Sequence, residues 1–466
     1  MMKLSGKHCS VWRALLCVCV PWFGAIPLAC HDSEVEYLAP VNTSTDSVPY
    51  IAGRDSAHKV PVDTGTVMDW ASETGGDTQT EGSDTVQTEL ADTVTASDAA
   101  WDSDASSDSN TADGAPGTWT LMLYMSADSD LEESMLLDLQ ELSTVVLPDW
   151  LNIVILFDRR EGLDTTDGDW KGTRLFRVNP AMESGLERLA DATYMGLTAA
   201  GDNEERDLGD VRTLEQFIQY SKATFPAAHY GLVLSGHGNG WQKKGANFAP
   251  LAKVICSDDS GFTDGISVQN DLAPLLQMYP MDVLGFDACL MGMVEVAWAV
   301  KDSVKYMIAS EANEASYGWD YEAWINEWAN AIDHSALNLA KTQVVTYRRF
   351  HEEYHLKPWV MTMAVVDTAM LDALGEAINN LVATYTLADY VYQAMTFDDY
   401  YHDYYDLLHI AELTGDNTLK DAIDAAVIFR WNSEGGGVPG GLSIRFVEGV
   451  DTEYRQIAFC VDLDWC

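Results

Sequence analysis

Short apolar runs alternate with amphipathic segments from residue 118 onward, and this alternation strongly limits the folds open to the chain. Residues 118–125, 151–157 and 230–235 are apolar along most of their length, as buried strands are. Residues 128–142 and 210–225 instead carry apolar side chains at the spacing of a helix that packs on one face. Strands that alternate with helices in this way are typical of a mostly parallel sheet with helices on both faces. The sequence therefore predicts an α/β fold.

The alternation continues to about residue 310, and the chain becomes more helical beyond residue 320. The further helices are predicted over residues 268–278, 290–300, 337–353, 368–385, 398–413 and 419–431. The further strands are predicted over residues 283–286, 306–310, 359–366 and 441–446. We therefore expect a core over residues 117–320 and a C-terminal helical part over residues 321–466, whose late strands complete the fold.

The first 29 residues are typical of an export signal. A positively charged start precedes a mostly apolar run over residues 14–29, which Pro and Gly interrupt and which is too short for a good membrane span. The run ends in Pro27-Leu-Ala-Cys30, which resembles a bacterial lipobox, where the cysteine becomes the lipidated first residue after cleavage. An ordinary secretory signal cut near the same place is the alternative. Both interpretations predict an extracytoplasmic protein, and the first adds a lipid anchor that ties Cys30 to a membrane.

Residues 30–116 are predicted to be an acidic, disordered tether. They contain 18 Asp and Glu residues against two Lys and Arg, with no sustained apolar period. Such a segment cannot bury enough apolar area to fold, and its charges repel one another. The whole chain has a formal net charge of -46, which disfavours nucleic acid as a partner and favours basic substrates.

The cysteines divide by position. Cys30 is the candidate lipid anchor, and Cys460 and Cys466 lie close enough in sequence to pair in a compartment that permits disulfides. Cys256 and Cys289 remain in the predicted core. Because no CxxC pair and no zinc-type Cys/His spacing occurs, we predict no metal-ligating residues among the cysteines or elsewhere in the site.

Two predicted strands end at reactive side chains. The strand at 230–235 leads to His237, and the strand at 283–286 leads through Asp287 to Cys289. In open parallel sheets the chemistry lies at the carboxyl ends of the strands. A cysteine nucleophile needs a base nearby in the fold, although the two residues can be far apart in sequence. The pair predicts cysteine-dependent acyl transfer, as in a peptidase.

The segments His237-Gly-Asn-Gly-Trp241 and Gly285-Phe-Asp-Ala-Cys-Leu-Met-Gly292 resemble motifs of the clostripain family of cysteine peptidases. The resemblance continues, in the same order, at residues 123–132, 208–214, 294–297, 308–311 and 440–446. It covers roughly residues 118–450, and it implies a caspase-like fold whose catalytic core is the region 117–320. It also implies that His237 is the catalytic histidine, that Cys289 is the nucleophile, and that cleavage follows basic residues, especially Arg, with Lys left open.

Further roles follow from the same resemblance. Asp287 matches an acidic residue associated with the pocket for the basic side chain, although it could instead cap the helix that follows. Processing in this family is common between the histidine and the nucleophile, where Lys243, Lys244 and Lys253 are candidate points of self-cleavage, or else an exposed basic loop. The chemistry requires no cofactor, and because some members of the family need Ca²⁺, a Ca²⁺ requirement stays open.

The mechanism that these residues suggest is an acyl-enzyme cycle. Cys289 attacks the scissile carbonyl, and His237 protonates the leaving amine and then assists hydrolysis by water. Backbone N–H groups of Gly238 and of Cys289 itself are the candidate oxyanion donors. We also expect the N-terminus of the following helix to stabilise the Cys289 thiolate.

Two other functions remain as alternatives. His351-Glu-Glu-Tyr-His355 fits the H-E-x-x-H spacing of zinc peptidases on a predicted helix, but Arg348 shares its face, which indicates a solvated surface, and no third ligand is evident. The second alternative is a surface lipoprotein that uses the same fold for binding without catalysis. The presence of both His237 and Cys289 favours the enzyme.

Overall fold

The computed structural model describes residues 117–160, 162–191, 193–201, 204–241, 255–353, 360–397, 403–435, 437–446 and 452–466. All of them belong to one compact unit, Ser103–Cys466. The predicted signal, the predicted tether, Cys30 and the three candidate processing lysines lie outside the described residues. Within the described ranges, no helix has both the length and the apolar character needed to cross a membrane.

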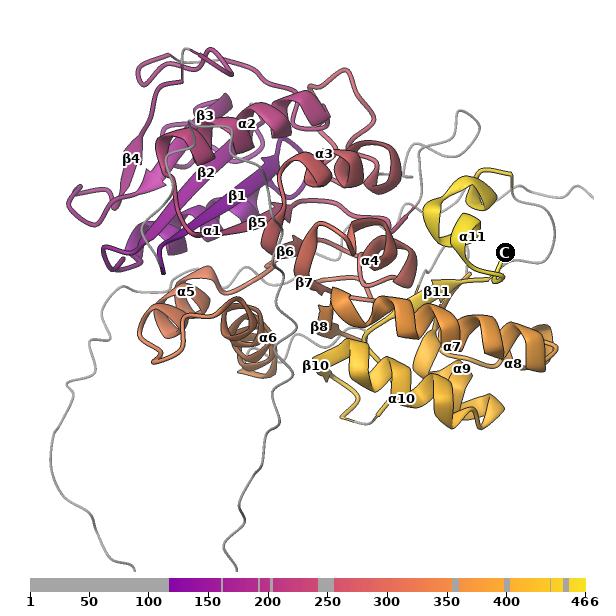
Figure 1. Ribbon diagram of the computed structural model, residues 1–466. Coiled ribbons are helices and arrows are strands. Elements are labelled where there is room, and N and C mark those ends of the chain that lie inside the picture. The colour runs from indigo at the N-terminus through magenta and orange to yellow at the C-terminus, as the bar shows by residue number, and fades with distance from the viewer. Residues whose placement is uncertain are drawn as a thin grey trace, which may run out of the picture. The chain divides into compact units, whose positions relative to one another are not determined.

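A nine-stranded sheet forms the centre of the unit, with the strand order β10-β8-β7-β6-β5-β1-β2-β3-β4 (Figure 1). Its strands are β1 Trp119–Ala127, β2 Leu151–Arg159, β3 Gly172–Val178, β4 Leu186–Arg188, β5 His229–Ser235, β6 Met281–Asp287, β7 Val304–Ala309, β8 Thr362–Asp367 and β10 Val427–Asn432. The five adjacent strands from β7 to β2 run parallel, and the strand pairs toward both edges are antiparallel. The predicted α/β fold with a mostly parallel central sheet is confirmed.

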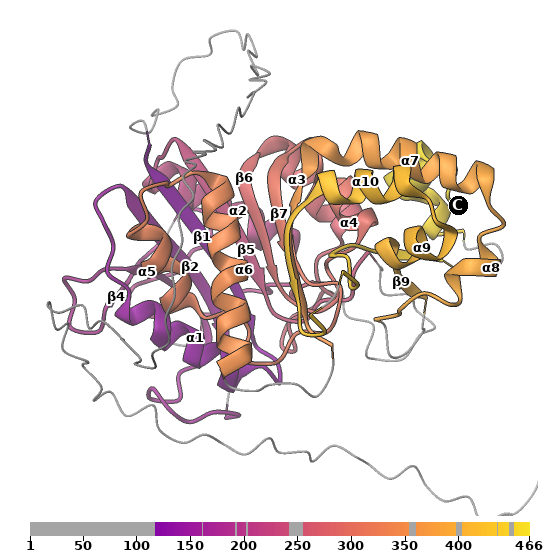
Figure 2. The ribbon, with the colours of Figure 1, turned by 90° about the horizontal axis from the view of Figure 1, so that it is seen from below.

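Helices cover both faces of this sheet (Figures 1 and 2). One apolar core lies between the sheet and the helices α1 Glu132–Thr144, α5 Tyr321–Ala329 and α6 Ala336–Glu353. The other lies against α2 Val211–Thr224, α3 Ala273–Met278, α4 Val294–Val300, α7 Leu371–Thr384, α9 Leu407–Thr414 and α10 Asn417–Ala426. Successive side chains of β1 point to opposite faces of the sheet, so this strand contributes to both cores. Leu121 and Leu123 belong to the first core, and Met122 and Tyr124 belong to the second.

The remaining described elements are short. The strands β9 Tyr404–Asp406 and β11 Ser443–Arg445 pair as a separate antiparallel sheet. The helices α8 Ala388–Val391 and α11 Ala458–Asp462 complete the C-terminal region. Cys460 and Cys466 form a disulfide there, with their Cα atoms 5.4 Å apart, as their closeness in sequence allowed.

Three predicted helices differ from the structure. The helix predicted over 419–431 ends at Ala426, and the chain continues as β10, because Val427–Asn432 pairs with β8 at the edge of the sheet. Within the region 398–413, predicted as one helix, residues 404–406 form the buried strand β9 and the helix α9 begins only at Leu407. The helix predicted from residue 290 begins only at Val294. In the first two cases, pairing with a distant strand outweighs the local helical pattern.

Candidate active site

The segments that carry His237 and Cys289 come from adjacent parallel strands in matched register. Ser235 at the end of β5 pairs with Asp287 at the end of β6. His237 lies two residues after Ser235, and Cys289 lies two residues after Asp287. The Gly236 N–H donates to the Asp287 carbonyl at 3.2 Å. The sheet therefore brings the two predicted catalytic segments side by side at its carboxyl edge.

Gly238 packs directly against the segment of the nucleophile. A Cβ added at Gly238 would lie 2.5 Å from the Cys289 carbonyl oxygen and 2.9 Å from the Ala288 Cβ. Both distances are below the closest approach that real Cβ atoms make, so the lack of a side chain lets the two backbones come together. The backbone at Gly238 is therefore in direct contact with the segment that carries Cys289.

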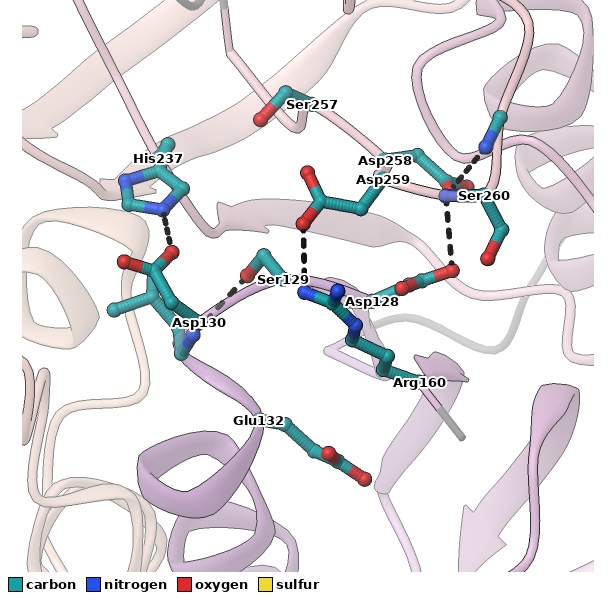
Figure 3. Close-up of polar contacts among 12 residues, drawn as sticks. Asp128, Ser129, Asp130, Glu132, Arg160, His237, Ser257, Asp258, Asp259 and Ser260 are labelled. Carbon is teal, nitrogen blue, oxygen red and sulfur yellow. Dashed lines mark hydrogen bonds and ion pairs between the residues drawn. The ribbon is translucent and has the colours of Figure 1, made fainter. Parts of the chain in front are cut away.

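The His237 ring is held by an acidic residue that the sequence analysis did not identify. Its Nε2 lies 2.6 Å from Oδ1 of Asp130, in the loop between β1 and α1 (Figure 3). The His237 side chain is 26% exposed and that of Asp130 is 75% exposed, so the pair faces solvent. With Nε2–H donated to the carboxylate, Nδ1 is the ring nitrogen left to exchange a proton. Asp130 lies far from both motifs in sequence, and no spacing rule marks it.

Cys289 is partly exposed, and its sulfur interacts with Glu314. Sγ accepts the Glu314 N–H at 3.3 Å and lies 3.8 Å from the Glu314 carbonyl oxygen. Burial raises the pKa of the thiol to about 12, and the negative charges of Glu314 and Asp287 add to the effect. In the absence of other charges, Cys289 is therefore a thiol at neutral pH.

The prediction that a helix N-terminus stabilises the Cys289 thiolate is wrong. The helix α4 begins at Val294 and its N-cap is Met293, so four residues separate Cys289 from the first turn. The effect of a helix dipole fades within that first turn. The alternative role of Asp287 as the cap of this helix is also wrong, because α4 has no side-chain cap.

Asp287 is buried near the nucleophile, and it accepts hydrogen bonds from two hydroxyls and from the Trp319 N–H. Its Oδ2 accepts from the Tyr321 hydroxyl at 2.9 Å and from the Ser235 hydroxyl at 3.2 Å. Burial raises the pKa of this carboxyl to about 6, although both hydroxyls oppose the shift. A Cβ added at Gly318 would lie 2.9 Å from both carboxylate oxygens, so Gly318 covers the acid closely.

Two further buried acids lie near Asp287. Glu314 accepts the Ala288 N–H at 3.3 Å, and burial followed by the charge of Asp287 raises its pKa well above the usual value. Burial and the same charge raise the pKa of Asp138, on α1, in the same direction. The sequence analysis found Asp287 but missed Glu314 and Asp138, which approach it from different elements. This buried, mutually repelling set of acids is suited to receive a cation.

The H-E-x-x-H segment lies at the end of α6, away from these residues in sequence. His351 is buried against the Tyr347 ring at 4.2 Å between centroids, and burial lowers its pKa to about 4. The expectation of a solvated histidine is therefore wrong, because this face of α6 packs into the core. Glu352 is exposed and pairs with Arg348, while His355 lies outside the described residues.

A separate group of acids could hold a cation. The residues Asp128, Asp158, Glu205 and Asp258 each offer one carboxylate oxygen, and these oxygens all lie within 4.8 Å of one another. Asp128 precedes Asp130 by two residues. The sequence analysis predicted no metal ligands, since these four residues come from four separate segments without a recognisable spacing.

Comparison with known proteins identifies the relatives of this chain. A model of the clostripain family matches residues 123–428. Clostripain from Hathewaya histolytica is 32% identical over 190 residues, which cover 38% of this chain and only 35% of that relative. The matched region thus spans about a third of the curated relative.

Two solved structures share the fold. A secreted C11 cysteine protease from Bacteroides thetaiotaomicron, in complex with an irreversible peptide inhibitor, has a TM-score of 0.59 at 19% identity and covers 75% of this chain and 100% of its own. An inactive zymogen C11 protease from Parabacteroides distasonis has a TM-score of 0.57 at 20% identity. The match covers 74% of this chain and 97% of the Parabacteroides protein. These likenesses support the caspase-like architecture that the motifs implied. Because the family model spans well over half of the sequence, the chain belongs to the clostripain family of cysteine peptidases.

Proposed function

We propose that this protein is a cysteine endopeptidase that cleaves after basic residues, with Arg as the principal one and Lys left open, through an acyl-enzyme intermediate. One observation carries the proposal. The strands β5 and β6 end in register at a histidine segment and a cysteine segment, and the buried acids Asp287 and Glu314 lie close enough to Cys289 to raise the pKa of its thiol. Membership of the clostripain family favours this activity over a zinc peptidase or a binding lipoprotein.

In the proposed cycle, Cys289 Sγ forms a bond to the scissile carbonyl carbon and gives up its proton to His237. His237 then protonates the leaving amine, and the C–N bond breaks to leave a thioester. Water attacks the thioester while His237 accepts its proton; the C–S bond then breaks, the acid product leaves, and His237 returns the proton to Sγ to restore the thiol. The N–H groups of Gly238 and Cys289 are the proposed donors to the oxyanion, because Gly238 packs against the Cys289 backbone.

The preference for basic residues rests on the buried acids. A guanidinium forms two parallel hydrogen bonds with a carboxylate, and Lys offers a single charged group in the same place. We propose Asp287 as the principal partner, with Glu314 beside it. Burial raises the pKa of both carboxyls, and the charge of Asp287 adds to the rise at Glu314, so a bound cation would favour their charged forms. It would also offset the negative charge that helps to raise the pKa of Cys289.

Asp130 is the proposed positioning residue for His237, and its loss should slow the chemical step. Because it fixes the ring through Nε2, Asp130→Ala should lower kcat about tenfold to hundredfold with little change in KM. Asp130→Glu should recover part of the rate, since the side chain is exposed and can still reach the ring. Steady-state kinetics on an Arg peptide measure both parameters. Glu133→Ala, which removes an exposed acid nearby, is the control, and an equal loss there would contradict the role of Asp130.

We also propose that the protein is exported, that Cys30 anchors it to a membrane by a lipid, and that self-cleavage occurs at Lys243, Lys244 or Lys253. The lipobox-like sequence and the basic residues between His237 and Cys289 support these assignments. Labelling with a fatty-acid analogue, compared with Cys30→Ser, tests the anchor. Sequencing of the new N-terminus in wild type and in Cys289→Ala locates any cleavage.

The activity is tested with an Arg-based peptidyl chloromethyl ketone and its Leu counterpart. We expect the Arg reagent to inactivate the enzyme and to attach one equivalent to Cys289, as mapped by mass spectrometry of the modified peptide. The Leu reagent should react at least about tenfold more slowly, because it lacks the cation for the buried acids. Equal rates for both reagents would refute the basic preference, and an Arg reagent that left Cys289 unmodified would refute its role as nucleophile.

A further inference from the structure

We propose that Trp241 is a positioning residue for His237, and that the C-terminal segment over residues 452–466 holds Trp241 in place. The inference rests on the proposed function, because it concerns how the catalytic histidine is set. Trp241 follows His237 by four residues, at the far end of the loop that carries the histidine. Its side chain is only 6% exposed, so this end of the loop is fixed in the core.

The loop over residues 236–241 needs support from outside itself. Three of its six residues are glycines, and Gly240 has a positive φ of 66°. Glycine backbone loses the most freedom on ordering, so a single loop geometry requires contacts with other segments. The His237 ring contacts Asp130, which is 75% exposed, and an exposed ion pair holds a loop only weakly. The position of the ring therefore depends on how the backbone of this loop is held.

Two side chains hold the Trp241 ring. The Tyr454 ring packs against it with centroids 4.8 Å apart, and the Arg445 guanidinium lies 5.0 Å from the Trp241 centroid. The same guanidinium lies 4.9 Å from the Tyr454 centroid, so the three side chains form one cluster. Arg445 is 8% exposed and pairs with Asp403 at 2.8 Å. Contacts between a cation and aromatic rings strengthen when water is excluded in this way.

A buried acid on α4 fixes both partners of Trp241. Glu295 is 0% exposed, and its Oε1 accepts the Arg445 backbone N–H at 2.8 Å and the Tyr454 hydroxyl at 2.5 Å. The helix α4 follows the segment that carries Cys289. The cluster therefore links the far end of the histidine loop to the helix that comes after the nucleophile.

The middle of the loop rests on the same part of the fold. The Tyr404 hydroxyl donates to the Asn239 carbonyl at 3.1 Å. A Cβ added at Gly240 would lie 2.3 Å from Sδ of Met293, so the loop lies directly on this residue. Gly238, one residue after His237, contacts the Cys289 backbone. A shift at Trp241 would thus be passed along a short, closely packed loop to the catalytic pair.

The C-terminal segment is itself secured to the core. Phe459 is 0% exposed and packs against Trp298 on α4, with ring centroids 6.1 Å apart. Figure 1 shows α11 beside α4. Trp465 Nε1–H donates to the Arg445 carbonyl at 2.7 Å, and the Cys460–Cys466 disulfide closes the last seven residues. Terminal segments are poorly ordered unless they are tied down, and this one is tied down where it meets the histidine loop.

The first test measures the loop in the full-length chain with Cys289→Ala, so that the result does not depend on peptidase activity. Hydrogen–deuterium exchange with mass spectrometry follows the amides of residues 236–241. We expect Tyr454→Ala to speed their exchange at least about threefold, and Tyr454→Phe, which keeps the ring, to have a smaller effect. The control is Tyr220→Ala on α2, because Tyr220 is 8% exposed and packs against Tyr194 and Phe225 instead. It should leave this exchange unchanged.

The second test measures the rate of the active enzyme on an Arg peptide. Trp241→Ala should lower kcat about 10- to 100-fold with little change in KM, because misplacement of a catalytic group slows the chemical step. Trp241→Phe, which keeps an aromatic ring beside Arg445 and Tyr454, should recover most of the rate. Tyr454→Ala should also lower kcat, whereas Tyr220→Ala should keep it within about threefold of wild type.

The two tests separate this inference from the proposed function. An inactive wild-type enzyme would refute the peptidase, while faster exchange in Tyr454→Ala would still support the contact between the C-terminal segment and the histidine loop. Unchanged exchange in Tyr454→Ala would overturn the role of the C-terminal segment. An active wild type whose kcat is unaffected by Trp241→Ala, or is lowered equally by Tyr220→Ala, would overturn the role of Trp241.

Discussion

Replacement of Cys289 by alanine is expected to lower kcat/KM for an Arg peptide by at least about 10³-fold, because the other free thiol among the described residues, Cys256, is buried and cannot form the thioester. His237→Ala should cause a loss of similar size. The double variant should be little worse than either single variant, since the two residues act as one unit. Initial rates on a fluorogenic Arg peptide, with reductant present, measure all three.

The control for this experiment is Cys256→Ala, at the other free cysteine. Cys256 is buried, and burial raises the pKa of its thiol, so it should not react as a thiolate. We expect this variant to keep its rate within about threefold of wild type. If Cys289→Ala hydrolysed the peptide as fast as Cys256→Ala, cysteine catalysis through residue 289 would be excluded.

The sequence was informative wherever local pattern and tertiary structure agree. The apolar runs that became β1, β2, β5 and β6 are buried on both faces, so their composition alone identified them as central strands. Asp210 lies at the start of the helix predicted over residues 210–225, and it caps α2 with its side chain accepting the Arg212 N–H at 2.9 Å. Because residues after adjacent parallel strands meet at one edge, the sequence also indicated that the His237 and Cys289 segments would be neighbours.

The rest depended on contacts that no local pattern encodes. Val427–Asn432 continues a helical pattern but pairs with β8. Asp130 and Glu314 reach the site from loops, 107 residues from His237 and 25 residues from Cys289 respectively. Acidic residues are frequent in this chain, so composition could not mark these two among the 73 Asp and Glu residues. Only the folded arrangement shows which acids are buried together.

Among those buried acids, Asp287 is expected to determine the preference for basic residues. Asp287→Asn keeps the size of the side chain and an oxygen for the Tyr321 hydroxyl, but it removes the charge that would meet a guanidinium. Loss of one partner of a buried charge pair costs about 2–5 kcal/mol, so kcat/KM for an Arg peptide should fall roughly 30- to 5,000-fold. A matched Leu peptide should be cleaved no more slowly than by wild type.

The variant should not fail merely by unfolding. The pKa of Asp287 in the folded chain is raised to about 6, so ionisation of this buried acid opposes folding as pH rises above its ordinary value. Removal of the charge should leave the unfolding midpoint at pH 7 unchanged or higher. Glu295→Gln is the matched control, since Glu295 is also buried but bonds instead to the Arg445 N–H and the Tyr454 hydroxyl.

The pH dependence provides the sharpest test of this role. In the free enzyme Asp287 is neutral below about pH 6 and charged above it, so kcat/KM for an Arg peptide should rise with pH through this region. Asp287→Asn should reduce the rise for the Arg peptide to the smaller rise of a matched Leu peptide, whereas Glu295→Gln should preserve the difference between the two peptides. If Asp287→Asn kept both the wild-type rate on Arg and the rise near pH 6, the cation would have to be recognised elsewhere, and Glu314 and Asp138 would be the next acids to replace.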